Sequence, residues 1–433
     1  MKAVILAGGK GTRLATISNG KPKPLMKIGG RTVLDHQLEM LSKQGIQEVI
    51  LLIGYKGEMI IEYCGDGRQW GLSLNFIKEK SALGTSGAIK AAERILLGED
   101  FLVLYGDVML DMDLHGLIQF HRKSNSKATL VIHPNDHPHD SDLVEIDGEG
   151  RINGWLPKSS RKQGDYANLV NAAVYVLSPQ ILKWIPEGNS DFGSDIFPLL
   201  LDEGQYVAGY KTSEYIKDMG TLDRFNKVNS DYKSGLIKKR NLKNPQKAIF
   251  LDRDGTINKE KGLLHKADQM EIIFNADKAI SKINSSGYLA ICLTNQSVIA
   301  RNLCNFDELQ MINNRMDRLL GETGCYLDDL FFCPHHPDSG YPEERKEYKV
   351  LCQCRKPAIG MVKQAVAKYN LELSKCWMIG DRGVDIQLAQ NCGMKSILVQ
   401  TGFTNLVDQG DFKPDFIAKD LFEAVKHIIK NEY

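Results

Sequence analysis

Residues 248–258 read AIFLDRDGTIN. The four apolar residues at the start predict a buried strand, and Asp252 and Asp254 follow it together with a Gly-Thr turn. On an extended chain, a spacing of two residues tends to direct both side chains the same way. A second opening of this kind stands at residues 1–14, where MKAVILAGGKGTRL runs from an apolar stretch into a glycine-rich turn. The sequence therefore predicts two domains that each begin with a buried strand.

Length and composition are those of an ordinary soluble globular protein. The 433 residues suggest two or three domains of about 100–200 residues each. A formal net charge of +1 gives no field for binding nucleic acid or an anionic membrane, so we expect neither as a partner. No apolar run approaches the roughly 18 residues of a membrane span. The first apolar stretch is too short for a signal peptide, and we expect a cytoplasmic protein.

Apolar strand patterns alternate with amphipathic helical patterns twice along the chain. The first series occupies residues 1–232 and the second residues 247–433, and each predicts a largely parallel sheet with helices on its faces. The segment between them, residues 233–246, is basic and closed by Pro245, so we predict a linker. The fold class is α/β, with two doubly wound, Rossmann-like domains.

The glycine-rich turn of the first domain is suited to phosphate. Gly8, Gly9 and Gly11 leave backbone N–H groups open to phosphate oxygens, and Lys10 and Arg13 add positive charge. The motifs that follow, in order, are KPKPLMKIGG (21–30), LGTSGAI (83–89), YGDVML (105–110), VNAAVYVL (170–177) and IKDMGTLDRF (216–225). Through these motifs, residues 1–230 resemble the sugar-nucleotidyltransferase family, whose members begin G-G-x-G-T-R-L and continue to P-K-P.

This resemblance implies a reaction that depends on alignment and charge neutralisation. A sugar 1-phosphate attacks the α-phosphorus of a nucleoside triphosphate and pyrophosphate leaves; the attacking oxygen is already anionic. Arg13 suits the pyrophosphate because its guanidinium binds phosphate through two parallel hydrogen bonds. The resemblance places Lys23 at the reacting phosphates and Mg²⁺ on Asp107 and Asp218. The alternative is that these two aspartates only cap loops.

The resemblance also implies the residues that bind substrate. They are Gly8, Gly9, Lys10, Gly11, Thr12, Glu79, Gly84, Thr85, Lys158 and Asn171. Glu79 stands where relatives recognise the nucleobase. Its carboxylate could accept hydrogen bonds from both N1–H and N2–H of guanine, whereas uracil or thymine would offer one oxygen a single hydrogen bond from N3–H. The family's Glu-Lys-Pro near the sugar reads GWLPKSS at 154–160 here. Lys158 can still meet the sugar phosphate, but the glutamate for sugar hydroxyls is missing.

The second domain resembles the haloacid dehalogenase superfamily of phosphatases. In its aspartyl-phosphate mechanism Asp252 attacks phosphorus, while Asp254 protonates the leaving alcohol and then activates water. Further residues implied for the phosphoryl group are Thr294, Asn295, Arg355 and Lys356. Asp381, in MIGDRGVD, completes a Mg²⁺ site with the Asp252 carboxylate and the Asp254 backbone oxygen. The alternative is that DRDGT is a surface turn.

The nine cysteines include a metal-ligand pattern. Cys333-x-His335 and Cys352-x-Cys354 match a tetrahedral Cys₃His zinc site with no position open for catalysis, so we predict a structural zinc. The alternative is three reduced cysteines in a polar loop. We expect His336 to be a loop residue, and the other six cysteines to be thiols without a ligand role.

The motifs DRDGTIN, TNQSVIAR and CRKPAIGM, together with the cysteine loop, resemble the D-glycero-D-manno-heptose 1,7-bisphosphate phosphatases. Histidinol phosphatases share this loop. Where the family reads TNQSGIARG, Val298 and Asn302 replace glycines, and we expect the loop geometry to differ there.

Together the resemblances imply a bifunctional enzyme. The second domain removes the C7 phosphate of heptose 1,7-bisphosphate, and the first transfers GMP from GTP to the resulting heptose 1-phosphate, giving GDP-heptose. Mg²⁺ serves both active sites. The alternatives are another base, a hexose 1-phosphate such as that of mannose or glucose, a phosphatase acting on another sugar phosphate or on histidinol phosphate, and a first domain that only senses sugar nucleotides. The sequence does not indicate an oligomeric state.

Overall fold

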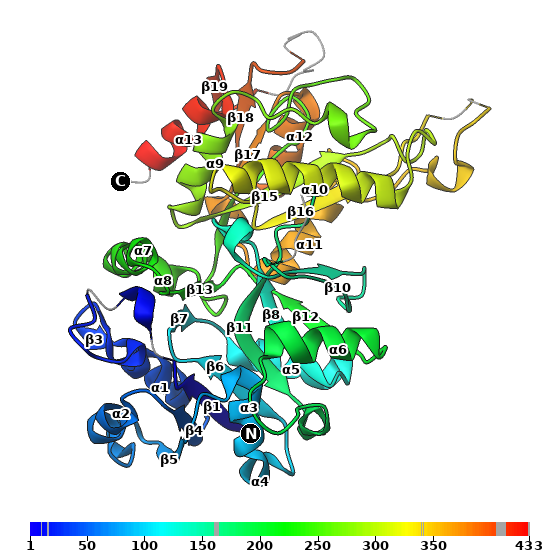
Figure 1. The fold of residues 1–433 in the computed structure, drawn as a ribbon. Helices are drawn as coiled ribbons and strands as arrows, with labels where there is room; N and C mark the ends of the chain where they lie inside the picture. The colour runs from blue at the N-terminus through cyan, green and yellow to red at the C-terminus, as the bar shows by residue number, and fades with distance from the viewer. Residues whose placement is uncertain are drawn as a thin grey trace. The chain divides into compact units, whose positions relative to one another are not determined.

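The protein consists of two compact units (Figure 1). The structure is a computed structural model, and it describes residues 1–9, 11–14, 17–159, 164–338, 340, 342–403 and 413–431. The first unit comprises residues 1–133, 141–161 and 169–241, and the second comprises residues 134–140, 162–168 and 242–433. Within the described ranges, no helix is both long and apolar enough to cross a membrane.

A mixed nine-stranded sheet forms the centre of the first unit. Its strands are β1 (Lys2–Ala7), β4 (Glu48–Ile53), β5 (Ser73–Lys78), β6 (Phe101–Tyr105), β8 (Ala128–His133), β9 (Leu143–Ile146), β10 (Ile152–Leu156), β11 (Val170–Leu177) and β12 (Val207–Lys211). β1 pairs in parallel with β4 and β6, as predicted. β11 runs antiparallel to both β6 and β8, so the sheet is parallel only in part.

Alternating apolar side chains of β1 bury one face of this sheet. Ile5 and Ala7 pack in one cluster with Leu51 of β4, Leu104 of β6 and Leu38 of helix α1. The helices of the unit are α1 (Val33–Lys43), α2 (Gly57–Cys64), α3 (Gly84–Ala91), α4 (Glu93–Leu96), α5 (Leu114–Ser124), α6 (Phe197–Asp202), α7 (Leu222–Lys233) and α8 (Leu236–Lys239). This packing fixes the end of β1, where the glycine turn begins.

The predicted linker is partly ordered structure of the first unit. Residues 236–239 form α8, and Leu236 and Ile237 are buried in a cluster with Met109 and Tyr215. Those two partners belong to a two-stranded ribbon of β7 (Val108–Asp111) and β13 (Tyr215–Asp218). Because residues 233–246 are mostly basic and polar, the sequence did not indicate this short apolar face.

The second unit contains a parallel six-stranded sheet in the order β16-β15-β14-β17-β18-β19. The strands are β14 (Lys247–Leu251), β15 (Tyr288–Asn295), β16 (Asp329–Cys333), β17 (Trp377–Gly380), β18 (Lys395–Val399) and β19 (Phe416–Ala418). The order reverses between β14 and β17, because β15 lies on one side of β14 and β17 on the other. Open α/β sheets bind ligands at the carboxyl ends of strands at such a point.

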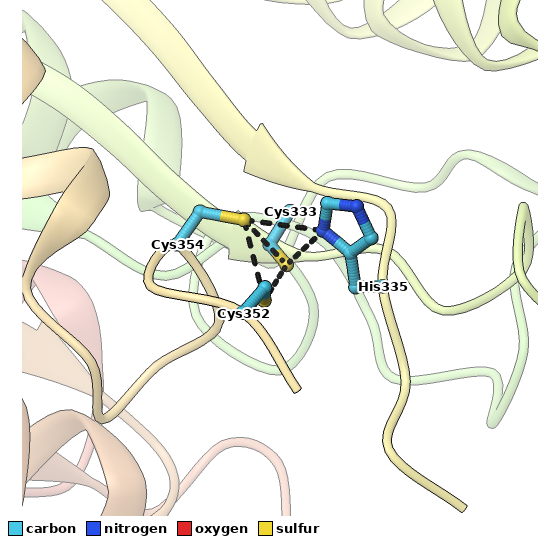
Figure 2. Close-up of side chains that lie close together, drawn as sticks. All are labelled: Cys333, His335, Cys352 and Cys354. Carbon is cyan, nitrogen blue, oxygen red and sulfur yellow. Dashed lines mark hydrogen bonds between the residues drawn. The ribbon is translucent and has the colours of Figure 1, made fainter. Parts of the chain in front are cut away.

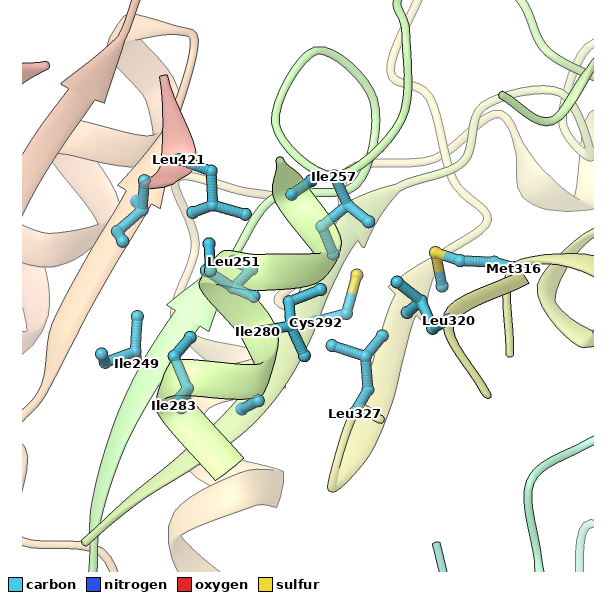
Figure 3. Packing of buried hydrophobic residues seen from close by; sticks show 14 of the residues in the cluster. Ile249, Leu251, Ile257, Ile280, Ile283, Cys292, Met316, Leu320, Leu327 and Leu421 are labelled. Atoms are coloured by element: carbon cyan, nitrogen blue, oxygen red, sulfur yellow. The ribbon is translucent and has the colours of Figure 1, made fainter. Parts of the chain in front are cut away.

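Both faces of this sheet are covered by helices, as the doubly wound prediction requires. The helices are α9 (Ala276–Asn284), α10 (Phe306–Glu322), α11 (Gly360–Tyr369), α12 (Gly383–Cys392) and α13 (Leu421–Lys430). Ile249 and Leu251 of β14 pack in one cluster with residues of α9, α10 and α13 (Figure 3). Ala248 and Phe250, which alternate with them, pack in another cluster with α11 and α12.

Two short segments from the predicted first domain cluster with the second unit. They are residues 134–140 and 162–168. Asp165 Oδ1 accepts a hydrogen bond from Arg318 Nε of α10 at 2.8 Å, and Asn168 N donates to Asp317 Oδ2 of the same helix at 3.1 Å. The sequence boundary at residue 232 did not foresee these segments, because their partners lie about 150 positions further along the chain.

The core packing of the second unit predicts the effect of a cavity. Ile280 of α9 is fully buried, and its replacement by alanine should lower the free energy of unfolding of this unit by about 2–5 kcal/mol. Urea unfolding followed by intrinsic fluorescence measures the change. Met311→Ala on α10 is the control, since Met311 is 56% exposed and alanine favours a helix. Equal destabilisation by both variants would contradict the packing described here.

Candidate active sites

Three buried carboxylates meet at the carboxyl end of the sheet in the second unit. Asp252 follows β14, Asp381 follows β17, and Asp385 lies in the first turn of α12. One oxygen of each lies within 4.8 Å of the others. Asp385 was not predicted from the sequence, although its place four residues after Asp381 in GDRGVD is the signal that could have found it. Its Oδ2 also caps α12 by accepting from the Arg382 backbone N–H at 3.2 Å.

Lys356 provides positive charge to this group. Its Nζ lies 2.9 Å from Asp252 Oδ1 and 2.7 Å from Asp385 Oδ1. Burial lowers the pKa of Lys356, but the two carboxylates outweigh burial and raise that pKa above its ordinary value. Asn295 holds the backbone in place, because its Oδ1 accepts from Lys356 N at 2.9 Å and its Nδ2 donates to Lys356 O at 3.2 Å.

The carboxylate group fits a divalent cation. Burial raises the pKa of Asp252 to about 8 against the charge of Lys356, and Asp385 and Asp381 add to the rise. Burial and Asp385 raise the pKa of Asp381 to about 6. Asp381 Oδ1 is buried without a hydrogen-bond partner in the described part of the chain. Three carboxylates beside one ammonium lack positive charge, and carboxylate oxygens are the ligands that Mg²⁺ prefers.

The side chain of Asp254 has different neighbours from that of Asp252. Its carboxylate accepts from Arg253 Nη2 at 2.9 Å, Asn258 Nδ2 at 2.9 Å and Gln296 Nε2 at 2.8 Å. Burial raises the pKa of Asp254, but these partners outweigh it and hold that pKa below its ordinary value. Asp252 and Asp254 nevertheless line the same cavity of about 650 Å³.

The cavity brings together the other predicted residues of this half. Its lining includes Thr294, Asn295, Arg355 and Lys356. It also includes His336, which lies in a loop, as predicted, but is only 9% exposed, and its Nε2 lies 3.4 Å from Arg301 Nη2. Arg301 itself lines the cavity and was not predicted.

The two predicted ligand pairs converge into one cluster (Figure 2). The sulfurs of Cys333 and Cys352 lie 3.1 and 3.4 Å from that of Cys354, and His335 Nδ1 lies 3.3 Å from Cys354 Sγ. Tetrahedral zinc with Zn–S bonds of about 2.3 Å has sulfur–sulfur edges of about 3.7 Å, so the donors fit zinc after a small expansion. None of the nine cysteines forms a disulfide bond.

This cluster is connected to the cavity through Arg355. The Arg355 backbone N–H donates to Cys352 Sγ at 3.3 Å, and its Nη1 donates to the His335 carbonyl at 3.1 Å. Arg355 is therefore positioned by two of the four candidate ligands. Asn302, which stands where the family has glycine, keeps a left-handed backbone (φ +56°) that asparagine tolerates. Its Oδ1 accepts from Arg345 Nε at 2.8 Å, which ties it to the cysteine loop.

The first unit has a cavity of about 680 Å³ where β1 ends. Of the predicted residues, its lining contains Gly8, Gly9, Lys23, Glu79, Gly84, Thr85 and Asp107. The two aromatic side chains at this cavity, Tyr55 and Tyr105, were not predicted, since an isolated tyrosine carries no sequence signal.

Close backbone approach explains the glycine turn. A Cβ on Gly8 would lie 2.7 Å from Glu79 Oε1, and one on Gly54 would lie 2.9 Å from the Gly8 carbonyl oxygen. Gly11 has φ +62°, and a Cβ there would meet the Lys23 side chain at 2.9 Å. Burial raises the pKa of Glu79. The glycines therefore let the Glu79 carboxylate and the Lys23 side chain lie against the turn.

Asp107 and Asp218 lie on neighbouring strand ends. The Met219 N–H donates to the Asp107 carbonyl at 3.0 Å. Lys23 Nζ lies 2.6 Å from Asp107 Oδ2, and Arg224 Nη1 lies 2.9 Å from Asp218 Oδ1. A Cβ on Gly220 would lie 3.5 Å from Arg13 Nη2 and 2.8 Å from Asp218 Oδ1, which places the Arg13 guanidinium beside this group. Each carboxylate is thus paired with a cation, and a Mg²⁺ site here stays a prediction.

Other predicted residues of the first unit have structural partners. Thr85 N and Oγ1 both donate to Asp191 Oδ1 at 2.9 Å. Asn171 Nδ2 donates to the Tyr175 hydroxyl at 3.0 Å, and Lys158 is exposed at the end of β10. Lys10 lies outside the described residues, as does the side chain of Thr12, whose backbone begins a short 3-10 helix.

Each half of the chain matches a known enzyme family. Residues 2–235 match the Nucleotidyl transferase family, and residues 353–424 match the HAD-hydrolase-like family. A D-glycero-beta-D-manno-heptose-1,7-bisphosphate 7-phosphatase of Haemophilus ducreyi is 37% identical over 42% of this chain and 98% of its own length. The mannose-1-phosphate guanylyltransferase of Mycobacterium tuberculosis is 33% identical over 54% of this chain, which spans 65% of that relative. HddC from Yersinia pseudotuberculosis is a solved structure with 29% identity, a TM-score of 0.47 and coverage of 53% of this chain and 99% of its own.

The four-ligand cluster predicts one zinc per chain. Cys352→Ser should lose most of this zinc and make the loop of residues 333–354 more sensitive to protease, because one of four donors is removed. Metal analysis of protein purified without added zinc measures the content, and Cys392→Ser, outside the cluster, is the control. Less than half an equivalent of zinc in the unaltered protein would contradict the prediction.

Proposed function

Because the chain belongs to the Nucleotidyl transferase family through residues 2–235 and to the heptose-1,7-bisphosphate 7-phosphatases through its C-terminal part, we propose that it catalyses two successive steps of nucleotide-activated heptose synthesis. The second unit removes the C7 phosphate of D-glycero-D-manno-heptose 1,7-bisphosphate. The first unit then transfers GMP from GTP to the heptose 1-phosphate that remains. The products are phosphate, pyrophosphate and GDP-heptose.

In the phosphatase step, an Asp252 oxygen forms a bond to phosphorus while the bond from phosphorus to the sugar oxygen breaks. Asp254 gives a proton to that oxygen, and water then cleaves the aspartyl phosphate. The negative charge of the bound substrate favours the protonated form of Asp254, which is needed when the aspartyl phosphate forms. Arg253 favours the ionised carboxylate of Asp254, which activates water when the aspartyl phosphate is hydrolysed. Bound Mg²⁺ would supply positive charge at Asp252, Asp381 and Asp385. Lys356 and Thr294 meet the phosphoryl oxygens.

In the transfer step, the side chains align charges and no general base is required. The sugar phosphate oxygen bonds to the α-phosphorus of GTP as the bond to pyrophosphate breaks. Arg13 and Lys23 neutralise the phosphates, and Mg²⁺ on Asp107 and Asp218 would add to this neutralisation. Glu79, on the cavity wall, accepts hydrogen bonds from guanine. Lys23 and Arg224, which pair with the two aspartates, would then bind phosphate oxygens of GTP in place of the carboxylates.

The observation that carries the proposal is the presence of the two enzyme families in one chain. Removal of the C7 phosphate leaves a sugar 1-phosphate, which is the substrate class of the other half. A histidinol phosphatase would give the first unit nothing to use. Similarity to a mannose-1-phosphate guanylyltransferase supports GTP, and it also makes mannose 1-phosphate the second candidate substrate.

The proposal predicts the preferred substrates of the first unit. Each of four nucleoside triphosphates is combined with heptose, mannose and glucose 1-phosphates, and pyrophosphate release is measured. GTP with heptose 1-phosphate should give the highest kcat/KM. A higher value with mannose 1-phosphate would favour the second candidate, and no release with any pair would support a sensor domain instead.

Two variants test whether pyrophosphate release takes place at the cavity of the first unit. Asp107→Ala should lower kcat by about 100-fold or more, since it removes a proposed Mg²⁺ ligand and the partner that positions Lys23, and both cations would neutralise the phosphates. Asp66→Ala is the matched control, because the Asp66 side chain is 62% exposed and pairs only with Arg68 among the ion pairs of the described residues. Near-normal release by Asp107→Ala would contradict the proposed site.

A further inference from the structure

The sugar side of the first unit lacks an acidic side chain at the expected place. Pro157 directly precedes Lys158, where the related motif has glutamate. Sugars are recognised mostly through hydroxyl groups, and a carboxylate is the side chain that accepts hydroxyl hydrogens most strongly. A carboxylate from another part of the chain could therefore occupy this position.

Asp142 lies where such a carboxylate is needed. It directly precedes β9, and its Oδ1 accepts from the Lys158 backbone N–H at 3.0 Å. Its carbonyl accepts from the Asn171 backbone N–H at 3.1 Å. One residue thus connects the strand ends that carry Lys158 and Asn171, two predicted substrate-binding residues that do not line the cavity.

The second oxygen of Asp142 is directed at a glycine. A Cβ on Gly193 would lie 3.2 Å from Asp142 Oδ2, so the missing side chain leaves room beside this oxygen. Within the described ranges, Oδ2 accepts no hydrogen bond, and Asp142 is half-buried. Gly193 lies two residues after Asp191, which binds Thr85 on the cavity wall. The open oxygen therefore belongs to the side of the fold that holds the predicted sugar contacts.

We propose that Asp142 binds a ring hydroxyl of the sugar 1-phosphate and determines sugar specificity in place of the absent glutamate. The inference rests on the proposed transfer reaction. The hydrogen bond from the Lys158 backbone N–H to Asp142 Oδ1 joins an acceptor for a hydroxyl to a cation for the phosphate. A sugar 1-phosphate presents these two groups a few bonds apart. The substrate is thus held at two points by one rigid pair of residues.

Asp142→Asn tests the role with little change in shape. The amide oxygen can still accept from Lys158 N–H, while an NH₂ group replaces the open oxygen. The KM for heptose 1-phosphate should rise at least 10-fold, because a site built for a hydroxyl loses its acceptor. The KM for GTP and phosphate release from heptose bisphosphate should not change. Asp147→Asn is the control, since Asp147 lies in the same hairpin and its side chain accepts, among described donors, only from Glu149 and Arg151 N–H.

Deoxy substrates separate a contact from a structural role. The 2-, 3- and 4-deoxy analogues of heptose 1-phosphate are compared in both proteins. In the unaltered protein, the analogue that lacks the hydroxyl bound by Asp142 should have a kcat/KM at least 10-fold lower than that of heptose 1-phosphate. In Asp142→Asn, this analogue and heptose 1-phosphate should have the same kcat/KM. Equal loss by all three analogues in both proteins would overturn the inference alone. No pyrophosphate release from the unaltered protein with any sugar 1-phosphate would overturn the proposed function as well.

Discussion

In each unit, a lysine ammonium lies against a carboxylate that follows a buried strand. The distance is 2.9 Å between Lys356 Nζ and Asp252 Oδ1, and 2.6 Å between Lys23 Nζ and Asp107 Oδ2. A buried charge costs several kcal/mol unless a partner compensates it. Each pair places opposite charges side by side at a proposed phosphate-binding position, and the cores beneath the strands keep the pairs in place. Phosphate chemistry needs this fixed charge, because reorganising charges during the reaction would raise the barrier.

The two sites differ in how their charges are balanced. In the second unit, three carboxylates stand beside Lys356; burial raises the pKa of Asp252, and Asp385 and Asp381 add to this rise. In the first unit, Asp107 and Asp218 each have a cationic partner. The second site therefore carries an anionic group that fits a metal before substrate arrives, whereas the first is close to neutral. This contrast agrees with an aspartate nucleophile in one reaction and charge alignment in the other.

Features carried by a local pattern could be predicted from the sequence, and features made by distant residues could not. Asp252 and Asp381 end apolar runs, and the cysteine pairs have ligand spacing, so each was visible. Asp142 was not, because its hydrogen-bond partners Lys158 and Asn171 are distant in sequence and reach it only in the folded sheet. The antiparallel direction of β11 could not be predicted either, because the sequence of a buried strand does not show whether it runs parallel or antiparallel to its neighbours. The packing of residues 134–140 and 162–168 with the second unit depends on contacts far along the chain.

The link between the two halves is the central claim, and Asp252→Asn tests it most directly. The variant keeps the shape of the nucleophile but loses the anionic oxygen. Mixed with heptose 1,7-bisphosphate and GTP, it should form no GDP-heptose, whereas heptose 1-phosphate and GTP should give product at close to the normal rate. Adding a separate heptose bisphosphate phosphatase should restore synthesis from the bisphosphate. Formation of GDP-heptose from bisphosphate and GTP by the variant alone would contradict either the nucleophile or the order of the two steps.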